Sequence, residues 1–161
     1  MKLERLLQLS FVLMIAVGGL FSCGESRDAG KAQESAAAQV FGQDIQLEGP
    51  LLRLGALQSV KVPVSVRNTS NFSWTPSGDH PVRFAYHWFD KDGRKVIHDG
   101  ERTFLAADLP VGSTAKLSAT VTAPPTAGDY TLRLTFVEEG VAWFDDEGAK
   151  PVEIPVKVEA P

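Results

Sequence analysis

The sequence has little cysteine and no long apolar run, and both shortages limit what the chain can be. Cys23 is the only cysteine among 161 residues, so an internal disulfide is excluded. The longest apolar run, from Leu6 to Leu20, covers about 15 residues, whereas a membrane-spanning helix needs about 20. Basic residues are in the minority, with 16 Lys and Arg against 20 Asp and Glu. A mildly acidic chain without a basic cluster is not expected to bind nucleic acid.

Patterns of catalytic and metal-binding residues are equally scarce. The sequence has no GxSxG motif, and His80, His87 and His98 are not spaced as HxH or HxxxH pairs. His87 alternates with the aromatic side of its expected strand, so we expect it on a sheet surface. Glu138 and Glu139 are adjacent, and on a strand they point to opposite faces instead of forming a catalytic pair. We therefore expect no enzyme, no metal site and no cofactor.

Two acidic stretches resemble the first half of a calcium loop. Asp90 and Asp92 lie in "FDKDGRK", and Asp145 opens the stretch "DDEG". Both lack the later ligands and the closing glutamate of such a loop. An Asp-Gly pair between two alternating runs is a common hairpin signal. We expect a hairpin turn near Asp92 and a solvated acidic turn at residues 145–148, with an adventitious Ca²⁺ site as the alternative.

Residues 1–22 have the composition of an export signal. Lys2 and Arg5 precede the apolar run, and small residues follow it. A charged start, a 7–15-residue apolar region and small residues near the end are typical of a leader that is cleaved off. A single membrane-spanning anchor is the alternative, and the length of the run argues against it.

The stretch Leu20-Phe21-Ser22-Cys23 resembles the lipobox of bacterial lipoproteins. Leu20, Ser22 and Cys23 match that pattern, whereas Phe21 is bulkier than is usual. The resemblance implies that Cys23 is acylated with lipid, palmitate included, and becomes the first residue after cleavage. It also implies a place in the bacterial cell envelope, with the membrane as partner and the rest of the chain outside the cytoplasm. Two or more acyl chains give stable anchoring, whereas one does not. An ordinary secreted protein with an incidental cysteine is the alternative.

Residues 23–44 are expected to form a flexible tether. They are small, polar and mixed in charge, and they lack the recurring large apolar residues that would bury a face. A flexible linker of about 20 residues has an r.m.s. span of roughly 25 Å.

From residue 45 to residue 161 the hydrophobic pattern has a period of two, which predicts strands. The alternating stretches cover residues 59–68, 82–90, 115–123, 130–138 and 152–158. Turn signals separate them, and we find no amphipathic helix. Seven or eight short strands predict one all-β domain, an immunoglobulin-like antiparallel β-sandwich. Pro63 cannot donate to a ladder, so its amide position is expected to face an edge or a bulge, and Pro155 interrupts the last stretch.

Two local features agree with this fold. Trp88 lies in the middle of the most aromatic stretch and is expected to fill the core. Tyr130 follows Gly128 and Asp129 just before an alternating run, which is similar to the tyrosine corner of immunoglobulin-like sandwiches.

A wider resemblance is carried by "YHWFDKDG", "GERTFL", "LPVGS", "VTAPPTAGDYTLRL" and "VEEGVAWF". Together these stretches resemble an immunoglobulin-like accessory domain of bacterial envelope proteins, sometimes appended to polysaccharide-handling enzymes. The likeness covers about residues 57–158. It implies a fold and an envelope setting, and it supplies no catalytic residue.

Aromatic residues near the strand ends are the candidate ligand contacts: Trp74, Trp143 and Phe144. Exposed indole faces at the rim of a sandwich can stack on sugars or bind a protein. The alternative, favoured by the high average burial of tryptophan, is that these residues close the ends of the core. Glu101 and Arg102 are expected to be solvated charges at a sheet edge.

These observations predict a lipid-anchored envelope protein whose sandwich is a non-enzymatic binding or scaffolding module. One alternative is a carbohydrate-binding module that uses Trp74 and Trp143 on an envelope polysaccharide. The other is an inhibitor or chaperone directed at an envelope protein.

Overall fold

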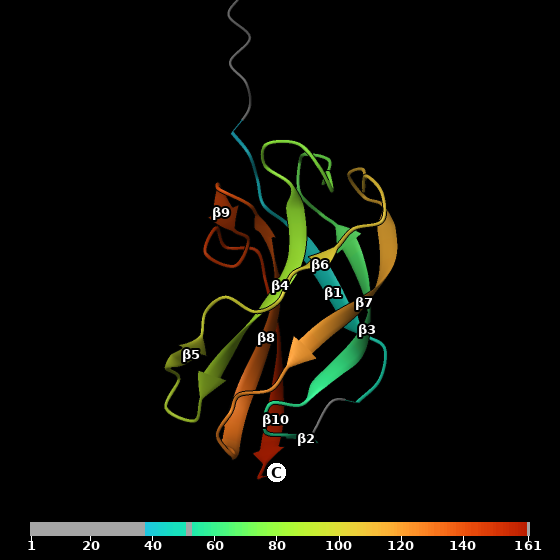
Figure 1. Cartoon of the computed structure of the whole chain (residues 1–161). Coiled ribbons are helices and arrows are strands. Elements are labelled where there is room, and N and C mark those ends of the chain that lie inside the picture. Colours follow the sequence, from blue (N-terminus) through green and yellow to red (C-terminus); the bar gives the residue numbers. More distant parts are fainter. Residues whose placement is uncertain (1–37, 51–52, 161) are drawn as a thin grey trace, which may run out of the picture. The chain divides into compact units, whose positions relative to one another are not determined.

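The computed structural model describes residues 38–50 and 53–160. Cys23, the expected leader and most of the expected tether lie outside the described residues. The described part consists of ten strands in two sheets that pack face to face, as the predicted immunoglobulin-like β-sandwich requires (Figure 1). Among the described residues, no helix is long and apolar enough to cross a bilayer.

The smaller sheet has three antiparallel strands in the order β1-β3-β7. Their bounds are β1 (Gln43–Leu47), β3 (Ser59–Asn68) and β7 (Thr114–Thr122). In β3 the alternation works as expected, because Val64 and Val66 are fully buried.

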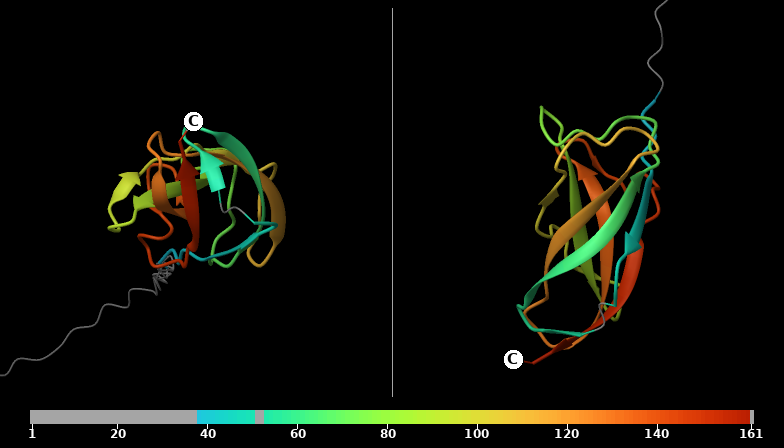
Figure 2. Two further views of the ribbon diagram at one scale, coloured as in Figure 1. Left: turned by 90° about the horizontal axis from the view of Figure 1, so that it is seen from below. Right: turned by 90° about the vertical axis from the view of Figure 1, so that its right-hand side faces the viewer.

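The larger sheet has the order β2-β10-β8-β4-β5, with β6 paired to β4 and β9 paired to β8. Its strands are β2 (Arg53–Gly55), β4 (Val82–Asp90), β5 (Lys95–Ile97), β6 (Thr103–Phe104), β8 (Gly128–Glu138), β9 (Ala142–Trp143) and β10 (Val152–Glu159). β2 runs parallel to β10, and the other pairs are antiparallel. The first part of the chain thus pairs with both sheets, through β1 and then β2. The described chain starts and ends at opposite ends of the sandwich (Figures 1 and 2).

Both expected local features are confirmed. Trp88 is fully buried, and its Nε1–H donates to the Thr122 carbonyl oxygen at 2.9 Å. The Tyr130 hydroxyl donates to the carbonyl oxygen of Thr126 at 3.0 Å, which is the bond of a tyrosine corner. The first bond joins the two sheets, because Trp88 lies in β4 and Thr122 in β7, and the second ties the turn before β8 to that strand.

The two strand prolines lie where one neighbouring strand stops. β1 ends at Leu47, and just beyond it the Glu48 amide donates to the Pro63 carbonyl oxygen at 2.9 Å. Among the described residues, β2 pairs with β10 only from Lys157 to Glu159, so it does not reach Pro155. Pro63 thus lies next to the end of β1, and within the described residues β2 does not pair with Pro155.

The folded part begins earlier than the expected boundary at residue 45. β1 starts at Gln43, which is buried, and Phe41 packs against the core. The expected tether up to residue 44 is therefore too long. The sequence pattern missed this because a glutamine is buried only when distant groups pair with it.

Those groups belong to a gap in the pairing of β8. The pairing with β10 ends at Leu134, and the pairing with β9 begins at Val137. In this gap, Gln43 Oε1 accepts a hydrogen bond from the Phe136 amide at 3.0 Å, and Gln43 Nε2 donates to Thr135 Oγ1 at 3.1 Å. A side chain from the smaller sheet thus supplies hydrogen bonds at a point where β8 of the larger sheet lacks a paired strand.

Replacing Gln43 with alanine should therefore lower the free energy of unfolding by about 2 kcal/mol, because it leaves the buried Phe136 amide unpaired. Urea unfolding followed by circular dichroism measures the change. Gln46→Ala is the matched control, since Gln46 is exposed on the same strand. Its effect should stay within about 0.5 kcal/mol. Equal effects of the two substitutions would contradict the role of Gln43.

Candidate functional site

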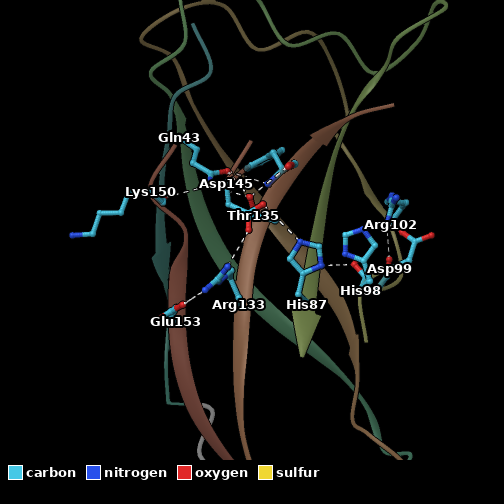
Figure 3. A network of polar contacts seen from close by, with 12 residues as sticks. Gln43, His87, His98, Asp99, Arg102, Arg133, Thr135, Asp145, Lys150 and Glu153 are labelled. Atoms are coloured by element: carbon cyan, nitrogen blue, oxygen red, sulfur yellow. Dashed lines mark hydrogen bonds and ion pairs between the residues drawn. The ribbon is translucent and has the colours of Figure 1, made fainter. Parts of the chain in front are cut away.

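Charged and aromatic side chains gather on the outer face of the larger sheet (Figure 3). Residues that lie directly opposite each other in paired strands share a face. The register places His87 of β4 opposite Arg133 of β8, and Arg133 opposite Glu153 of β10. These side chains point away from the core, because their neighbours Trp88 and Leu132 point into it.

Residues 142–149, here named the cover segment, begin beside the end of β8, and Trp143 and Asp145 contact residues of this face. The segment begins with β9, and the Phe144 amide then donates to the Phe136 carbonyl oxygen at 2.9 Å. Phe144 is fully buried and contacts Phe136 with ring centroids 5.9 Å apart. Trp143 instead packs on His87, with ring centroids 4.2 Å apart. The segment is thus held from both sides of the sheet.

His87 is 0% exposed, which corrects the expectation that it lies on a sheet surface. Its ring contacts those of His98 and Trp143, at centroid distances of 5.0 and 4.2 Å, and these two rings contact each other at 5.3 Å. The chain beside His98 can approach because residue 100 is glycine, since a Cβ there would lie 2.5 Å from the Tyr86 ring. Strand alternation correctly predicted which face of the sheet carries His87, but it could not show that other segments cover that face.

Both ring nitrogens of His87 face acceptors. Nδ1 is hydrogen-bonded to the carbonyl oxygen of His98, which can only accept. Nε2 faces Asp145 Oδ1 at 3.7 Å, and neither atom has a hydrogen-bond partner among the described residues. A neutral imidazole carries a hydrogen on only one nitrogen. A neutral ring can therefore donate to only one of these two acceptors.

Asp145 is the anion that faces this ring, and its side chain is only 3% exposed. The expectation of a solvated turn is therefore wrong at this residue. Burial alone raises the pKa of the Asp145 carboxyl, but the nearby His87 ring, followed by Arg133, outweighs it and holds the pKa at about 2. Arg133 lies 3.4 Å from Asp145 Oδ2 and bonds Glu153 at 2.6 and 3.0 Å. His87, Asp145, Arg133 and Glu153 thus follow one another across the face (Figure 3).

Arg102 is another cation held on this side of the molecule. Its guanidinium lies 4.7 Å from the centre of the Trp143 ring, and it pairs with Glu139 at 2.7 Å and with Asp99 at 2.5 Å. Burial alone lowers the pKa of Arg102, but the two carboxylates outweigh it and raise the pKa above its usual value. Arg102 is therefore partly enclosed and paired, unlike the solvated edge charge that we expected.

The three aromatic candidates lie in different surroundings. Trp74 and Phe144 are both 0% exposed and contact each other in the core, with ring centroids 5.4 Å apart. They close one end of the core, and neither can contact a ligand at the surface. Trp143 is half-buried, with His87 on one side and the Arg102 guanidinium close to its ring. None of the three is an exposed stacking platform.

A different aromatic residue is exposed on the same side of the sheet. Phe104 of β6 is 64% exposed, and the Arg83 guanidinium lies 4.3 Å from its ring centre. A similar contact joins Arg133 to Phe89, at 4.3 Å. Sequence reasoning missed Phe104, although its neighbour Leu105 supplied a signal. Adjacent strand residues point to opposite faces, so a phenylalanine beside a core leucine belongs outside.

The hollows on this face are shallow. One has a volume of about 420 Å³ and is lined by Arg133, Asp145, Lys150, Pro151 and Glu153. In residues 38–50 and 53–160, no three His, Cys, Asp or Glu side chains are grouped to hold a metal ion.

The stretch that contains Asp90 forms the expected hairpin turn between β4 and β5. Asp90 Oδ1 accepts hydrogen bonds from the amides of Asp92 and Arg94, both at 2.9 Å. The Arg94 amide is the main reason that the pKa of Asp90 lies below its usual value.

No protein-family model and no curated protein matches this chain. Among solved structures, it is similar to the CARDB domain of a Pyrococcus furiosus protein in complex with di-metal ions, with 16% identity over 73% of this chain and 86% of that one and a TM-score of 0.42. A family 123 glycoside hydrolase from Clostridium perfringens shows 6% identity over 74% of this chain and 27% of the enzyme, with a TM-score of 0.41. An ASH/PapD-like domain of human CEP192 shows 10% identity over 76% and 87%, with a TM-score of 0.30. The strand pairing described above carries the fold assignment.

Substituting Asp145 with alanine should lower the free energy of unfolding by about 3 kcal/mol near pH 6, because it removes the buried carboxylate that faces the His87 ring and pairs with Arg133. Asp146→Ala, at the exposed neighbouring position, is the matched control. The carboxyl has a lower pKa in the folded protein than its usual 3.8, so its contribution is complete above about pH 4 and is lost as the pH falls through about 2. Urea unfolding at several pH values should show the difference from the unsubstituted protein shrinking in this range. A difference that stays constant down to pH 2 would contradict the assignment.

Proposed function

We propose that this protein is a lipoprotein of the bacterial cell envelope whose sandwich binds a partner protein outside the cytoplasm, without catalysis. The anchor is inferred from sequence, since Cys23 ends a short apolar run within a lipobox-like stretch. Because the described chain starts at residue 38, about 15 residues separate it from Cys23, and these span at most about 50 Å. An anchor at Cys23 would keep the domain within that distance of a membrane.

The binding role is supported above all by the outer face of the larger sheet. Phe104 stands exposed there beside Arg83, and the half-buried Trp143 lies beside Arg102. Arginine and aromatic residues are enriched in protein interfaces and carry much of their binding energy. A rigid sheet also presents these groups in one arrangement, which lowers the entropy lost on binding.

A protein partner suits this face better than a polysaccharide. Stacking on a sugar needs an open aromatic face, and Trp74 and Phe144 are in the core. Trp143 carries His87 and Arg102 against its ring. The exposed Phe104 and the neighbouring charged groups instead suit a partner with an apolar contact bordered by carboxylates.

The pairing of the ionisable groups supports a role without catalysis. His87 and Asp145 face each other, and Arg133 lies between Asp145 and Glu153. A general base must reach a proton of the substrate, and a nucleophile needs such a base beside it. Here the only buried histidine is enclosed by two aromatic rings, a carbonyl group and a carboxylate, within the described part of the chain.

The Cys23→Ser protein should no longer incorporate labelled palmitate and should leave the membrane fraction, because serine lacks the thiol that is acylated. Fractionation of cells after labelling tests this. Ser22→Ala is the control, since it keeps a small residue before Cys23, and it should behave like the unsubstituted protein. If the Cys23→Ser protein stays in the membrane fraction as firmly as before, the anchor lies elsewhere.

A photo-crosslinking phenylalanine analogue at position 104 should yield a discrete adduct with one envelope protein in living cells. The same analogue at Lys61, exposed on the smaller sheet, is the control and should give no such adduct. Arg83→Ala in the position-104 variant should weaken the adduct several-fold, because it removes the cation beside the probe. A smear that resists protease but disappears on glycan digestion would point to the polysaccharide alternative. Identical adducts from positions 104 and 61 would refute the assigned face.

A further inference from the structure

We propose that His87 holds the cover segment in a proton-dependent manner. The segment is fastened to the outer face while the ring carries hydrogens on both nitrogens, and it opens more often once the ring has lost one. The inference concerns residues 142–149 and the sheet beneath them. It does not depend on whether the face binds a partner.

Two residues of the cover segment contact the ring of His87. Trp143 packs on the imidazole at 4.2 Å between centroids, and the carboxylate of Asp145 faces its Nε2 at 3.7 Å. The imidazole is also stacked on the His98 ring, nearly parallel at 5°, and the His98 ring contacts that of Trp143 in turn. His87 is fully buried, so no solvent shields these contacts.

Loss of one proton from the His87 ring turns its contact with Asp145 from favourable to unfavourable. The hydrogen on Nδ1 stays, because it is bonded to the His98 carbonyl oxygen. The proton is therefore lost from Nε2, and its lone pair then faces the carboxylate oxygen Oδ1. Neither atom has another hydrogen-bond partner among the described residues. A buried polar pair without a hydrogen between its members is unfavourable, so the arrangement with Asp145 turned toward solvent gains population.

The local structure of the cover segment permits it to open when His87 loses a proton. Asp145 is followed by three exposed residues, and Gly148 has a φ of +88°, a conformation that glycine adopts without strain. The Phe144 side chain anchors the segment in the core, which favours a local opening over loss of the fold. At the far end, the Lys150 carbonyl oxygen accepts from Gln43 Nε2 at 3.2 Å, so the segment also contacts the first strand.

Other charged groups near His87 determine how far the loss of its proton favours opening of the cover segment. From β8, Arg133 lies 3.4 Å from Asp145 Oδ2 and continues to hold the carboxylate in part. From the stretch before β6 come the exposed ring of His98 and the Asp99–Arg102 pair. His98 is itself ionisable, so the test must separate its effect from that of His87.

Nuclear magnetic resonance of the full-length chain in detergent micelles tests the protonation directly. At pH 5 the nitrogen shifts of the His87 ring should be those of an imidazolium with hydrogens on both Nδ1 and Nε2. At pH 8 only the Nδ1 hydrogen should remain. A ring with a single hydrogen at pH 5 would refute the proposal.

Hydrogen exchange tests the opening in the same sample. The Ala149 amide donates to the Phe144 carbonyl oxygen at 2.9 Å, so its protection reports whether the segment beyond the Phe144 anchor is closed. After correction for intrinsic exchange, its protection should fall several-fold between pH 5 and pH 8. The β3 amides should not change, which separates local opening from unfolding. Equal protection of Ala149 at both pH values would overturn the proposal.

Two substitutions assign the effect to the pair. Asp145→Asn should abolish the pH dependence, because an amide can donate to the neutral Nε2. His98→Gln should retain the pH dependence, because its backbone carbonyl group stays in place. If the pH dependence persists in Asp145→Asn, or disappears in His98→Gln, the switch lies outside the His87–Asp145 pair. If the Asp145→Asn protein fails to fold, the two measurements on the unsubstituted chain still decide.

Discussion

The structure depends on one requirement, that polar groups buried around β8 find partners. β8 is paired on one side along its length by β4, but the pairing on its other side is interrupted at Thr135 and Phe136. Gln43 from the first strand supplies the missing hydrogen bonds to the Phe136 amide and the Thr135 hydroxyl. Because an unpaired buried amide is costly, the position of β1 and the break in the larger sheet must be established together.

The same break allows the chain to leave the sheet and return over it. Phe144 enters the core and Trp143 remains on the outer face, so successive residues of the cover segment are anchored on opposite sides of β8. This covering encloses His87 and brings a carboxylate against it. This part of the sheet face is therefore shielded from solvent, and the side chains of His87 and Asp145 are buried there. The proposed recognition surface surrounds this covered part, and the proposed response to protons arises within it.

Strand alternation and turn residues identified much of this fold in advance. Trp88 and Tyr130 take their expected places because a core position and a turn followed by an alternating strand are local patterns. The site was predicted far less well. His87 and Asp145 are 58 positions apart in the numbering, and neither stretch carries any sign that the other will cover it. Arg102 was expected to be solvated for the same reason, since Trp143 and Glu139 reach it from another part of the chain.

The sequence by itself determined which residues alternate, where the turns lie and which side of each strand is apolar, because these depend on neighbours within a few positions. Tertiary structure alone decided which polar residues are buried. Gln43, His87 and Asp145 resemble ordinary surface residues in the sequence, and they are enclosed only because distant segments close over them. Burial of a polar group requires a partner at hydrogen-bonding distance, and that distance exists only once the sheets have packed.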